Sequence, residues 1–129
     1  MKRFICYAVP LISVMALIFY MSSLSYIPES GVSDVFSIKP LIYHFSVFLL
    51  LAFLSKRCFA AYNFNNPALT AFIFVLLYSL TDEMHQYFVP NRNFDIFDIL
   101  IDNLGSFMIV FYLFYKTKTR KADIRTIKE

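Results

Sequence analysis

The chain has 129 residues, 59% of them hydrophobic and only 16% charged, with a mean hydropathy of +0.60. Soluble domains carry roughly 25% charged residues, so the composition favours a membrane protein over a water-soluble domain. The length allows one domain, residues 1–129. The net charge of +3 is small, and the basic residues lie at the chain ends and in short loops, which argues against nucleic-acid binding.

The first apolar run is Phe4–Met21, which follows the basic start Lys2-Arg3. Its 18 residues exceed the apolar core of a signal peptide, which is about 7–15 residues, and only a weak cleavage site follows. We therefore predict an uncleaved transmembrane helix over 4–22. Pro10 is expected to kink it, with neighbouring helices satisfying the freed backbone groups.

The second predicted span is 40–55, an apolar run interrupted by His44 and Ser46 and ended by Lys56-Arg57. The next run, Ala68–Leu80, is short for a span of about 20 residues. Extending the helix over 67–88 gives a length of about 31 Å. This extension places acidic and histidine side chains in the last turns of a membrane helix, with Pro67 at its first position.

The fourth predicted span is 95–115, after a turn over 89–93 and before a run of basic residues that begins at Lys116. The sequence thus predicts an all-α integral membrane bundle of four helices. If the N-terminus is cytoplasmic, ten basic residues lie on the cytoplasmic side and only Lys39 and Arg92 outside, which satisfies the positive-inside rule. Both termini are then cytoplasmic. Cys6 and Cys58 would lie at that reducing face, so we expect no disulfide.

A polar stretch, Thr81 to Gly105, interrupts this apolar chain and would lie between the third and fourth helices at the outer face. Ionisable residues persist in a membrane when they face the bundle interior and satisfy one another. Arg92 is expected to fork onto a carboxylate, and His44 to reach the same level from the second helix. The candidate site residues are His44, Asp82, Glu83, His85, Gln86, Arg92, Asp95, Asp98, Asp102 and Asn103.

Several buried carboxylates cannot all remain charged without cations, hydrogen bonds or shared protons. The sequence leaves three outcomes open: neutralisation by Arg92 and the histidines, protonation, or a divalent ion or cationic ligand. The metal candidates are Asp82, Glu83 and Asp98, although no fixed ligand spacing identifies a metal. A purely structural network that fixes helix register is the competing interpretation. For Gly105, close helix packing is favoured over ligand approach.

The segment Asp82–Arg92, followed by Asp95, Asp98, Asn103 and Gly105, resembles the signature of the VanZ-like family. Three upstream features match other short motifs of that family: Ser22-Ser23, Lys39 and His44-Phe45. The resemblance covers about 22–105. Asn91 stands where the family usually has Gly, and Asn tolerates positive φ, so the turn can survive. Ile109 also replaces a usual Gly, which leaves close packing at that position open.

The resemblance implies a small bacterial membrane protein related to the accessory protein that raises resistance to the glycopeptide teicoplanin. It marks His44, Asp82, Glu83, Gln86, Arg92, Asp98 and Asn103 as functional candidates. We expect a multi-pass plasma-membrane protein of the cell envelope that binds or modifies an exported component, such as a lipid-linked precursor or a glycopeptide. One alternative is a metal-assisted enzyme acting on a lipid-linked phosphoester or acyl substrate, with His85 as acid–base. Another is a structural or partner-binding bundle.

Overall fold

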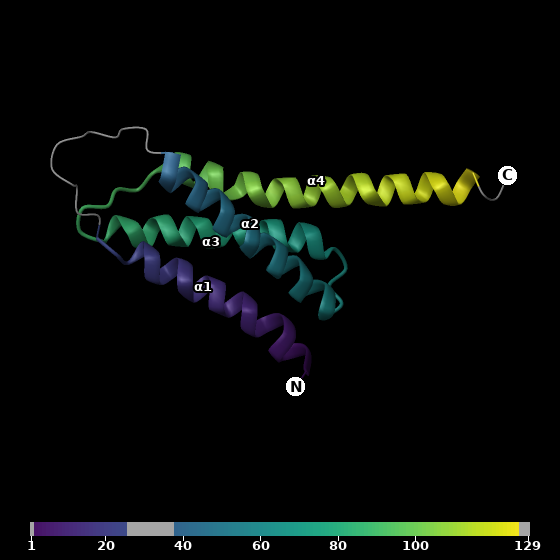
Figure 1. Ribbon diagram of the computed structural model, residues 1–129, viewed down its shortest axis with the longest axis horizontal. Helices are drawn as coiled ribbons and strands as arrows, with labels where there is room; N and C mark the ends of the chain where they lie inside the picture. Colours follow the sequence, from purple (N-terminus) through teal and green to yellow (C-terminus); the bar gives the residue numbers. More distant parts are fainter. Residues whose placement is uncertain (1, 26–37, 127–129) are drawn as a thin grey trace.

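The structure is a computed structural model that describes the backbone of residues 2–25 and 38–126, and the side chains of 2–25 and 41–112. Its helices are the π-helical turn η1 (Phe4–Ala8), α1 (Val9–Ser22), α2 (Ile38–Ala61), α3 (Pro67–Tyr87) and α4 (Ile96–Thr126). No strand occurs in these ranges. The all-α prediction is confirmed, and Figure 1 shows the helices side by side in one bundle.

Helices α2, α3 and α4 pack against one another, and α1 lies against α2 and α3 on the side away from α4 (Figure 1). The apolar core between them is built on Ile18, Phe48, Leu51 and Val75, each at most 1% exposed. Ile109 of α4 packs against this core and is partly buried. The core therefore joins all four helices and holds their ends in register.

Gly105 lies where α4 packs closely against α2. A Cβ atom added there would lie 3.1 Å from the Cβ of Leu49 and 3.2 Å from its Cα. Any larger residue would push the two helices apart, because packed interiors have little room to yield. The prediction that Gly105 serves helix packing is confirmed.

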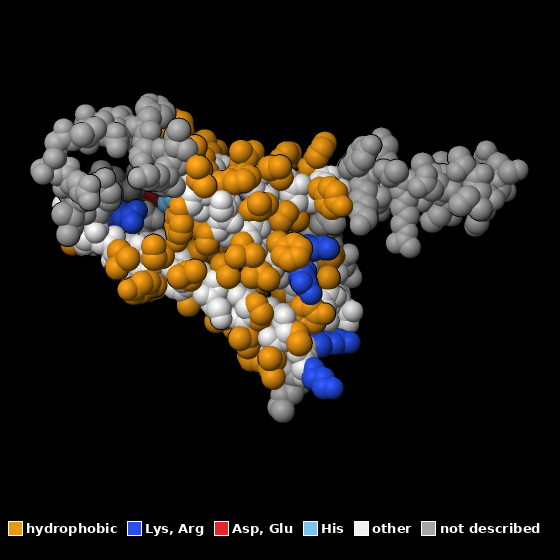
Figure 2. Space-filling model, in the orientation of Figure 1, with side chains coloured by type: hydrophobic (Ala, Val, Ile, Leu, Met, Phe, Trp, Pro, Cys, Tyr) orange, Lys and Arg blue, Asp and Glu red, His pale blue; other side chains and the backbone are white. Residues whose placement is uncertain are grey.

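Three helical segments within the described part of the chain are long and apolar enough to cross a membrane: Phe4–Ser22, Leu41–Ala61 and Pro67–Tyr87. Hydrophobic side chains cover much of the visible surface of the described residues (Figure 2), as expected for a surface that faces lipid. The side chains of α4 are described only as far as Tyr112, and α4 is not among these three segments. Its membrane crossing stays a prediction.

The first helix contains a π-helical turn just before Pro10, where a kink was expected. The chain makes a π-helical turn over Phe4–Ala8, and Pro10 falls in the first turn of α1. Proline lacks an N–H and its ring crowds the carbonyl four residues earlier. The π-helical turn directly before the proline leaves room for both effects, and such turns are common sites of helix kinks.

The prediction that the second span ends at residue 55 was wrong, because α2 continues to Ala61. The Arg57 guanidinium lies 5.6 Å from the ring centroids of both Tyr7 and Phe53, so a basic residue is accommodated within the helix. Beyond the helix, Asn63 has φ 62° and the Phe64 N–H donates to the Phe59 carbonyl at 3.0 Å. This arrangement is a Schellman cap, a common way for helices to end.

Helix α3 begins at Pro67 as predicted and ends at Tyr87, one residue before the expected limit. The Asn66 side chain caps it by accepting a hydrogen bond from the Leu69 N–H at 3.2 Å. Helix α4 begins at Ile96 but runs to Thr126, well past the predicted end at 115, and projects beyond the other helices in Figure 1. The basic run that was expected to end it consists largely of Lys, Arg and Ala, which favour helix.

Candidate functional site

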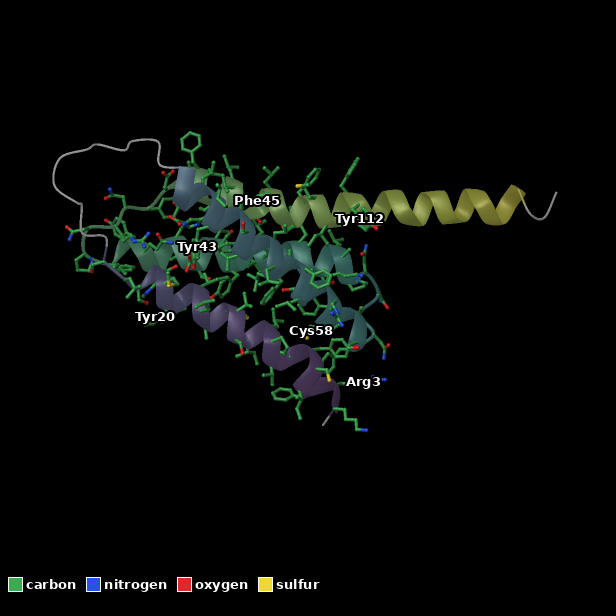
Figure 3. All side chains as sticks on the ribbon, in the orientation of Figure 1. Arg3, Tyr20, Tyr43, Phe45, Cys58 and Tyr112 are labelled. Atoms are coloured by element: carbon green, nitrogen blue, oxygen red, sulfur yellow. The ribbon has the colours of Figure 1, made fainter. Side chains whose placement is uncertain are left out.

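The end of α1, the start of α2, the end of α3 and the start of α4 meet at one end of the bundle (Figure 1). Polar side chains are buried there, and nitrogen and oxygen atoms gather between the helices near Tyr43 and Tyr20 in Figure 3. We call this region the polar end; its buried members are Ser22, His44, Asp82, Glu83, Gln86 and Asp102. Arg3 and Cys58 mark the opposite end (Figure 3), where blue Lys and Arg side chains gather in Figure 2.

One face of α3 leads from the apolar core into the polar end. Its buried residues recur every three or four positions, so they form a single stripe on the helix. The stripe begins with Ala71 and Val75, passes Ser79, and ends with Asp82, Glu83 and Gln86. The same helical periodicity that builds the core therefore also buries two carboxylates.

Asp82 is held by two donors on one of its oxygens. The Ser22 hydroxyl donates to Asp82 Oδ2 at 2.9 Å, and Gln86 Nε2 donates to the same oxygen at 3.0 Å. The Ser22 bond ties the end of α1 to α3, while Gln86 lies one turn further along α3. Asp82 Oδ1 is buried and has no hydrogen-bond partner.

Arg92 does not fork onto a carboxylate, and that prediction was wrong. Its Nη1 donates to Gln86 Oε1 at 3.4 Å and its Nε donates to the Leu24 carbonyl at 3.3 Å. Cations are favoured beside the free carbonyls at a helix C-terminus, and Leu24 lies just past the end of α1. Arg92 thus secures the end of α1 and leaves the carboxylates without an arginine partner among the described residues.

The turn before Arg92 explains this placement. Asn91 has φ 62°, and the Arg92 N–H donates to the Val89 carbonyl at 3.2 Å. Pro at the second position and a positive φ at the third are typical of a type II turn. Asn91 therefore adopts the conformation for which the family usually has Gly, and the prediction that the turn survives is confirmed.

Glu83 and Asp95 meet where α4 begins. The Asp95 N–H donates to Glu83 Oε2 at 2.9 Å, and Asp95 Oδ1 accepts from the Phe97 N–H at 2.8 Å. The exposed Asp95 side chain thus caps α4, whereas Glu83 is completely buried and its Oε1 has no partner. Asp98, one turn into α4, is half-buried.

His44 and Asp102 form a buried pair between α2 and α4. His44 Nδ1 lies 3.0 Å from Asp102 Oδ1, and the two residues are 6% and 0% exposed. It is the only ion pair within the described residues, and the second oxygen, Asp102 Oδ2, has no partner. The next residue of α4, Asn103, donates from Nδ2 to Ser79 Oγ at 2.8 Å and so links α4 to α3.

His85 lies at the α1 side of the polar end. Its ring stacks on Phe19 with a centroid separation of 4.4 Å, and its Nε2 lies 2.9 Å from Ser23 Oγ. The single Ser23 hydroxyl proton already donates to the Phe19 carbonyl, so His85 Nε2 must be the donor. His85 therefore joins α3 to the end of α1 and does not touch the other candidate residues through a hydrogen bond.

Five buried polar atoms in the described residues have no hydrogen-bond partner, and all belong to this region: Tyr43 Oη, Asp82 Oδ1, Glu83 Oε1, Asp102 Oδ2 and Asn103 Oδ1. Buried polar atoms in folded proteins are nearly always bonded, so each exception requires an explanation. Here four of the five can only accept hydrogen bonds when the carboxylates are ionised. The polar end thus has an excess of buried acceptors.

The metal candidates Asp82, Glu83 and Asp98 are not arranged as a metal-binding group. No set of three or more His, Cys, Asp or Glu side chains in the described residues lies close enough to hold an ion. Cys6 and Cys58 are both free.

The sequence did not identify Ser23, Tyr43 and Ser79 as part of the site. Ser23 lies against His85, Ser79 accepts a hydrogen bond from Asn103, and the Tyr43 hydroxyl is among the unpartnered atoms. Ser22-Ser23 matched a family motif, but the bond to Asp82 was not predicted. A signal was available, because Ser22 ends the first apolar run at the same predicted depth as the acidic turns of the third. The side chain of Lys39, another motif residue, lies outside the described residues.

The VanZ/LLP1 family model matches residues 7–118. Neither a curated protein nor a solved structure is similar enough to the chain to count as a match. The family match spans all four helices and includes every residue of the polar end. The chain therefore belongs to the VanZ/LLP1 family.

Proposed function

We propose that the protein is a multi-pass bacterial plasma-membrane protein with α4 as a fourth span, both termini in the cytoplasm and the polar end beneath the outer surface. Three apolar helices and the distribution of basic residues support this topology. At the polar end, His44 lies about 9 Å inside the start of α2, at a rise of 1.5 Å per residue. A site at this depth is reached from the outer leaflet.

Single cysteines test the topology in a variant that carries Cys6→Ser and Cys58→Ser. A membrane-impermeant maleimide added to intact cells should label a cysteine at Asn93, between α3 and α4, and should spare one at Asn65, between α2 and α3. The opposite pattern would contradict the proposed orientation.

The function we propose is binding of an exported cell-envelope component at the polar end. The observation that supports it is the set of unpartnered oxygens on Asp82, Glu83 and Asp102, which are 4%, 0% and 0% exposed. Leaving a buried polar group without a partner costs about 1–3 kcal/mol, and more for a charged group. A bundle that served structure alone would gain stability by pairing these groups or replacing them, so their retention favours a ligand.

Membership in the VanZ/LLP1 family makes glycopeptide tolerance the first phenotype to measure. The chain would be expressed in a glycopeptide-susceptible bacterial host beside Glu83→Gln and Asp102→Asn variants, with Asp123→Asn as a matched change far along α4. Wild type and Asp123→Asn should alter teicoplanin sensitivity or envelope lipid composition, and the two buried variants should not. Unchanged sensitivity and composition with wild-type protein in the membrane would contradict the proposal.

A second candidate function is a membrane enzyme, favoured by the His44–Asp102 pair. A carboxylate bonded to one ring nitrogen orients a histidine and supports proton transfer at the other nitrogen. This arrangement suits acyl or phosphoester transfer with His44 as the acid–base group, a role that the sequence had suggested for His85. Envelope lipids from cells with and without the protein would be compared by mass spectrometry; a product that is absent with both His44→Gln and Asp102→Asn would support the enzyme.

A further inference from the structure

We infer that the polar end binds an ammonium group that carries N–H donors, presented by a lipid headgroup or a small amine. The inference deepens the proposed function and rests on it for the ligand's arrival from the outer leaflet. It names the chemistry that the site would recognise.

The first step concerns charge. Asp82, Glu83 and Asp102 are almost completely buried, and His44 is the only basic side chain within ion-pair distance of any of them in the described residues. Arg92, the nearest arginine in sequence, donates to an amide and a backbone carbonyl instead. Buried charges without partners are strongly unfavourable, and among the described side chains only His44 can supply positive charge to these carboxylates.

The second step concerns hydrogen bonds. Each carboxylate uses one oxygen and leaves the other bare: Asp82 Oδ1, Glu83 Oε1 and Asp102 Oδ2. Protonation alone would convert a bare acceptor into a bare donor, since no described side chain or backbone group accepts from these atoms. A ligand that brings both positive charge and several N–H donors satisfies both requirements.

The third step selects the cation. The acidic side chains do not converge closely enough to hold a metal within the described residues, and Ca²⁺ or Mg²⁺ needs about six or more oxygens around one point. A primary ammonium supplies positive charge and three N–H donors without the six-fold oxygen coordination that these metals need. A quaternary ammonium has the charge and no donor, so it would leave the oxygens bare.

The fourth step concerns how a lipid could approach. Tyr43 has a buried hydroxyl among the unpartnered atoms, and it also lines a groove of about 520 Å³ on α2. The other lining residues are Ile42, Ser46, Val47 and Leu50, which are mostly apolar. We place the chain of an amphiphile along this groove and its headgroup at the Tyr43 hydroxyl, the one point that the groove shares with the unpartnered atoms. A soluble amine would use the polar end alone.

The test uses the purified full-length chain in neutral detergent. Ethylammonium chloride should raise the unfolding temperature in a concentration-dependent way, because a ligand that binds the folded state stabilises it by mass action. Tetramethylammonium chloride at the same ionic strength should not. An equal response to both salts, or to neither, would overturn the inference for a soluble amine.

The lipid arm uses native mass spectrometry with equimolar phosphatidylethanolamine, phosphatidylcholine and phosphatidylglycerol. Selective retention of phosphatidylethanolamine supports a headgroup ligand, whether or not ethylammonium raises the unfolding temperature. A response to ethylammonium alone supports a small amine. Retention of the three lipids in equal amounts together with no response to ethylammonium would overturn the inference for both sources.

Variants assign the binding to the polar end. Glu83→Gln and Asp102→Asn keep the shape of the side chain and should weaken binding by roughly tenfold to a hundredfold, the effect of losing one hydrogen bond to a charged group. Asp123→Asn should bind like wild type. Equal binding by all four proteins would overturn the assignment.

The same variant separates this inference from the proposed function. If Glu83→Gln abolishes ammonium binding but leaves the envelope phenotype of the wild-type protein unchanged, only the proposed envelope role fails. If Glu83→Gln abolishes the phenotype while the wild-type protein does not bind ammonium, only the ligand class fails.

Discussion

The apolar core and the polar end both contain fully buried side chains, but burial has opposite effects on stability in the two regions. Phe48, Leu51 and Val75 in the apolar core and Glu83 and Asp102 in the polar end are all at most 1% exposed. In the core, burial brings side chains into close contact and every loss of volume destabilises the protein. In the polar end, burial removes water from carboxylate oxygens that the described residues do not satisfy. The apolar core therefore maintains the fold, whereas the polar end carries its buried oxygens at a cost in stability.

The largest effect is expected from separating the His44–Asp102 pair. His44→Leu leaves Asp102 buried without its partner and should lower the free energy of unfolding by about 3–5 kcal/mol. The double variant His44→Leu/Asp102→Leu should recover most of that loss, because an apolar pair can replace a buried ion pair. Unfolding in detergent measures the free energies of the single and the double variant. A double variant no more stable than His44→Leu would contradict the claim that the uncompensated charge of Asp102, rather than the change in side-chain shape, causes the loss.

The core should respond in the opposite way. Leu51→Ala leaves a cavity far from the carboxylates and should cost roughly 2–4 kcal/mol, while ethylammonium binding at saturation remains unchanged. Leu51→Met preserves volume and serves as the control, with a cost below about 1.5 kcal/mol. Loss of binding in folded Leu51→Ala protein would show that the two regions are not separable.

Gly105 lies near the boundary between the two regions. Gly105→Val introduces a branched side chain where even a Cβ would approach Leu49 at 3.1 Å, so we expect a loss of about 1–3 kcal/mol from overpacking. Gly105→Ala should fall between this variant and wild type. Unchanged stability in both variants, measured by thermal unfolding, would contradict the close approach of α4 to α2.

The smallest effects come from two turns with the same conformation at opposite ends. Asn63 and Asn91 both have φ 62°, so replacement by Ala should cost about 1–2 kcal/mol at each position, and replacement by Gly should cost little. Only Asn91→Ala should also weaken ligand binding, because it disturbs the placement of Arg92. Equal effects of both Ala variants on binding would remove the distinction between the two ends.

Much of this comparison could be predicted from the sequence. The short apolar run 68–80 required extension through Asp82 and Glu83, and α3 does extend to Tyr87. Pro67, Asn91 and Gly105 were also interpreted correctly, because each depends on a local steric property of proline, asparagine or glycine. These properties act over a few residues and do not depend on what packs nearby.

The features that the sequence missed depend on partners from distant segments. Arg92 binds Gln86 and Leu24 instead of a carboxylate because the turn directs it toward the end of α1. Arg57 allows α2 to continue because Tyr7 of η1 and Phe53 lie beside it. Ser22 reaches Asp82 across a sequence separation of 60 residues. Spacing within one helix carries no information about such contacts.

The unfolding free energy of Glu83→Gln without ligand tests the central claim most directly. The glutamine keeps an oxygen for the Asp95 N–H. It removes the buried negative charge, and this gain exceeds the cost of the amide N–H groups that then take the place of the bare Oε1. We predict that the variant unfolds with a free energy about 0.5–2 kcal/mol higher than wild type, as for other changes that relieve a functional site, while ethylammonium binding weakens by roughly tenfold to a hundredfold. A variant less stable than wild type that binds ethylammonium as tightly as wild type would show that Glu83 serves the fold, and the account would be wrong.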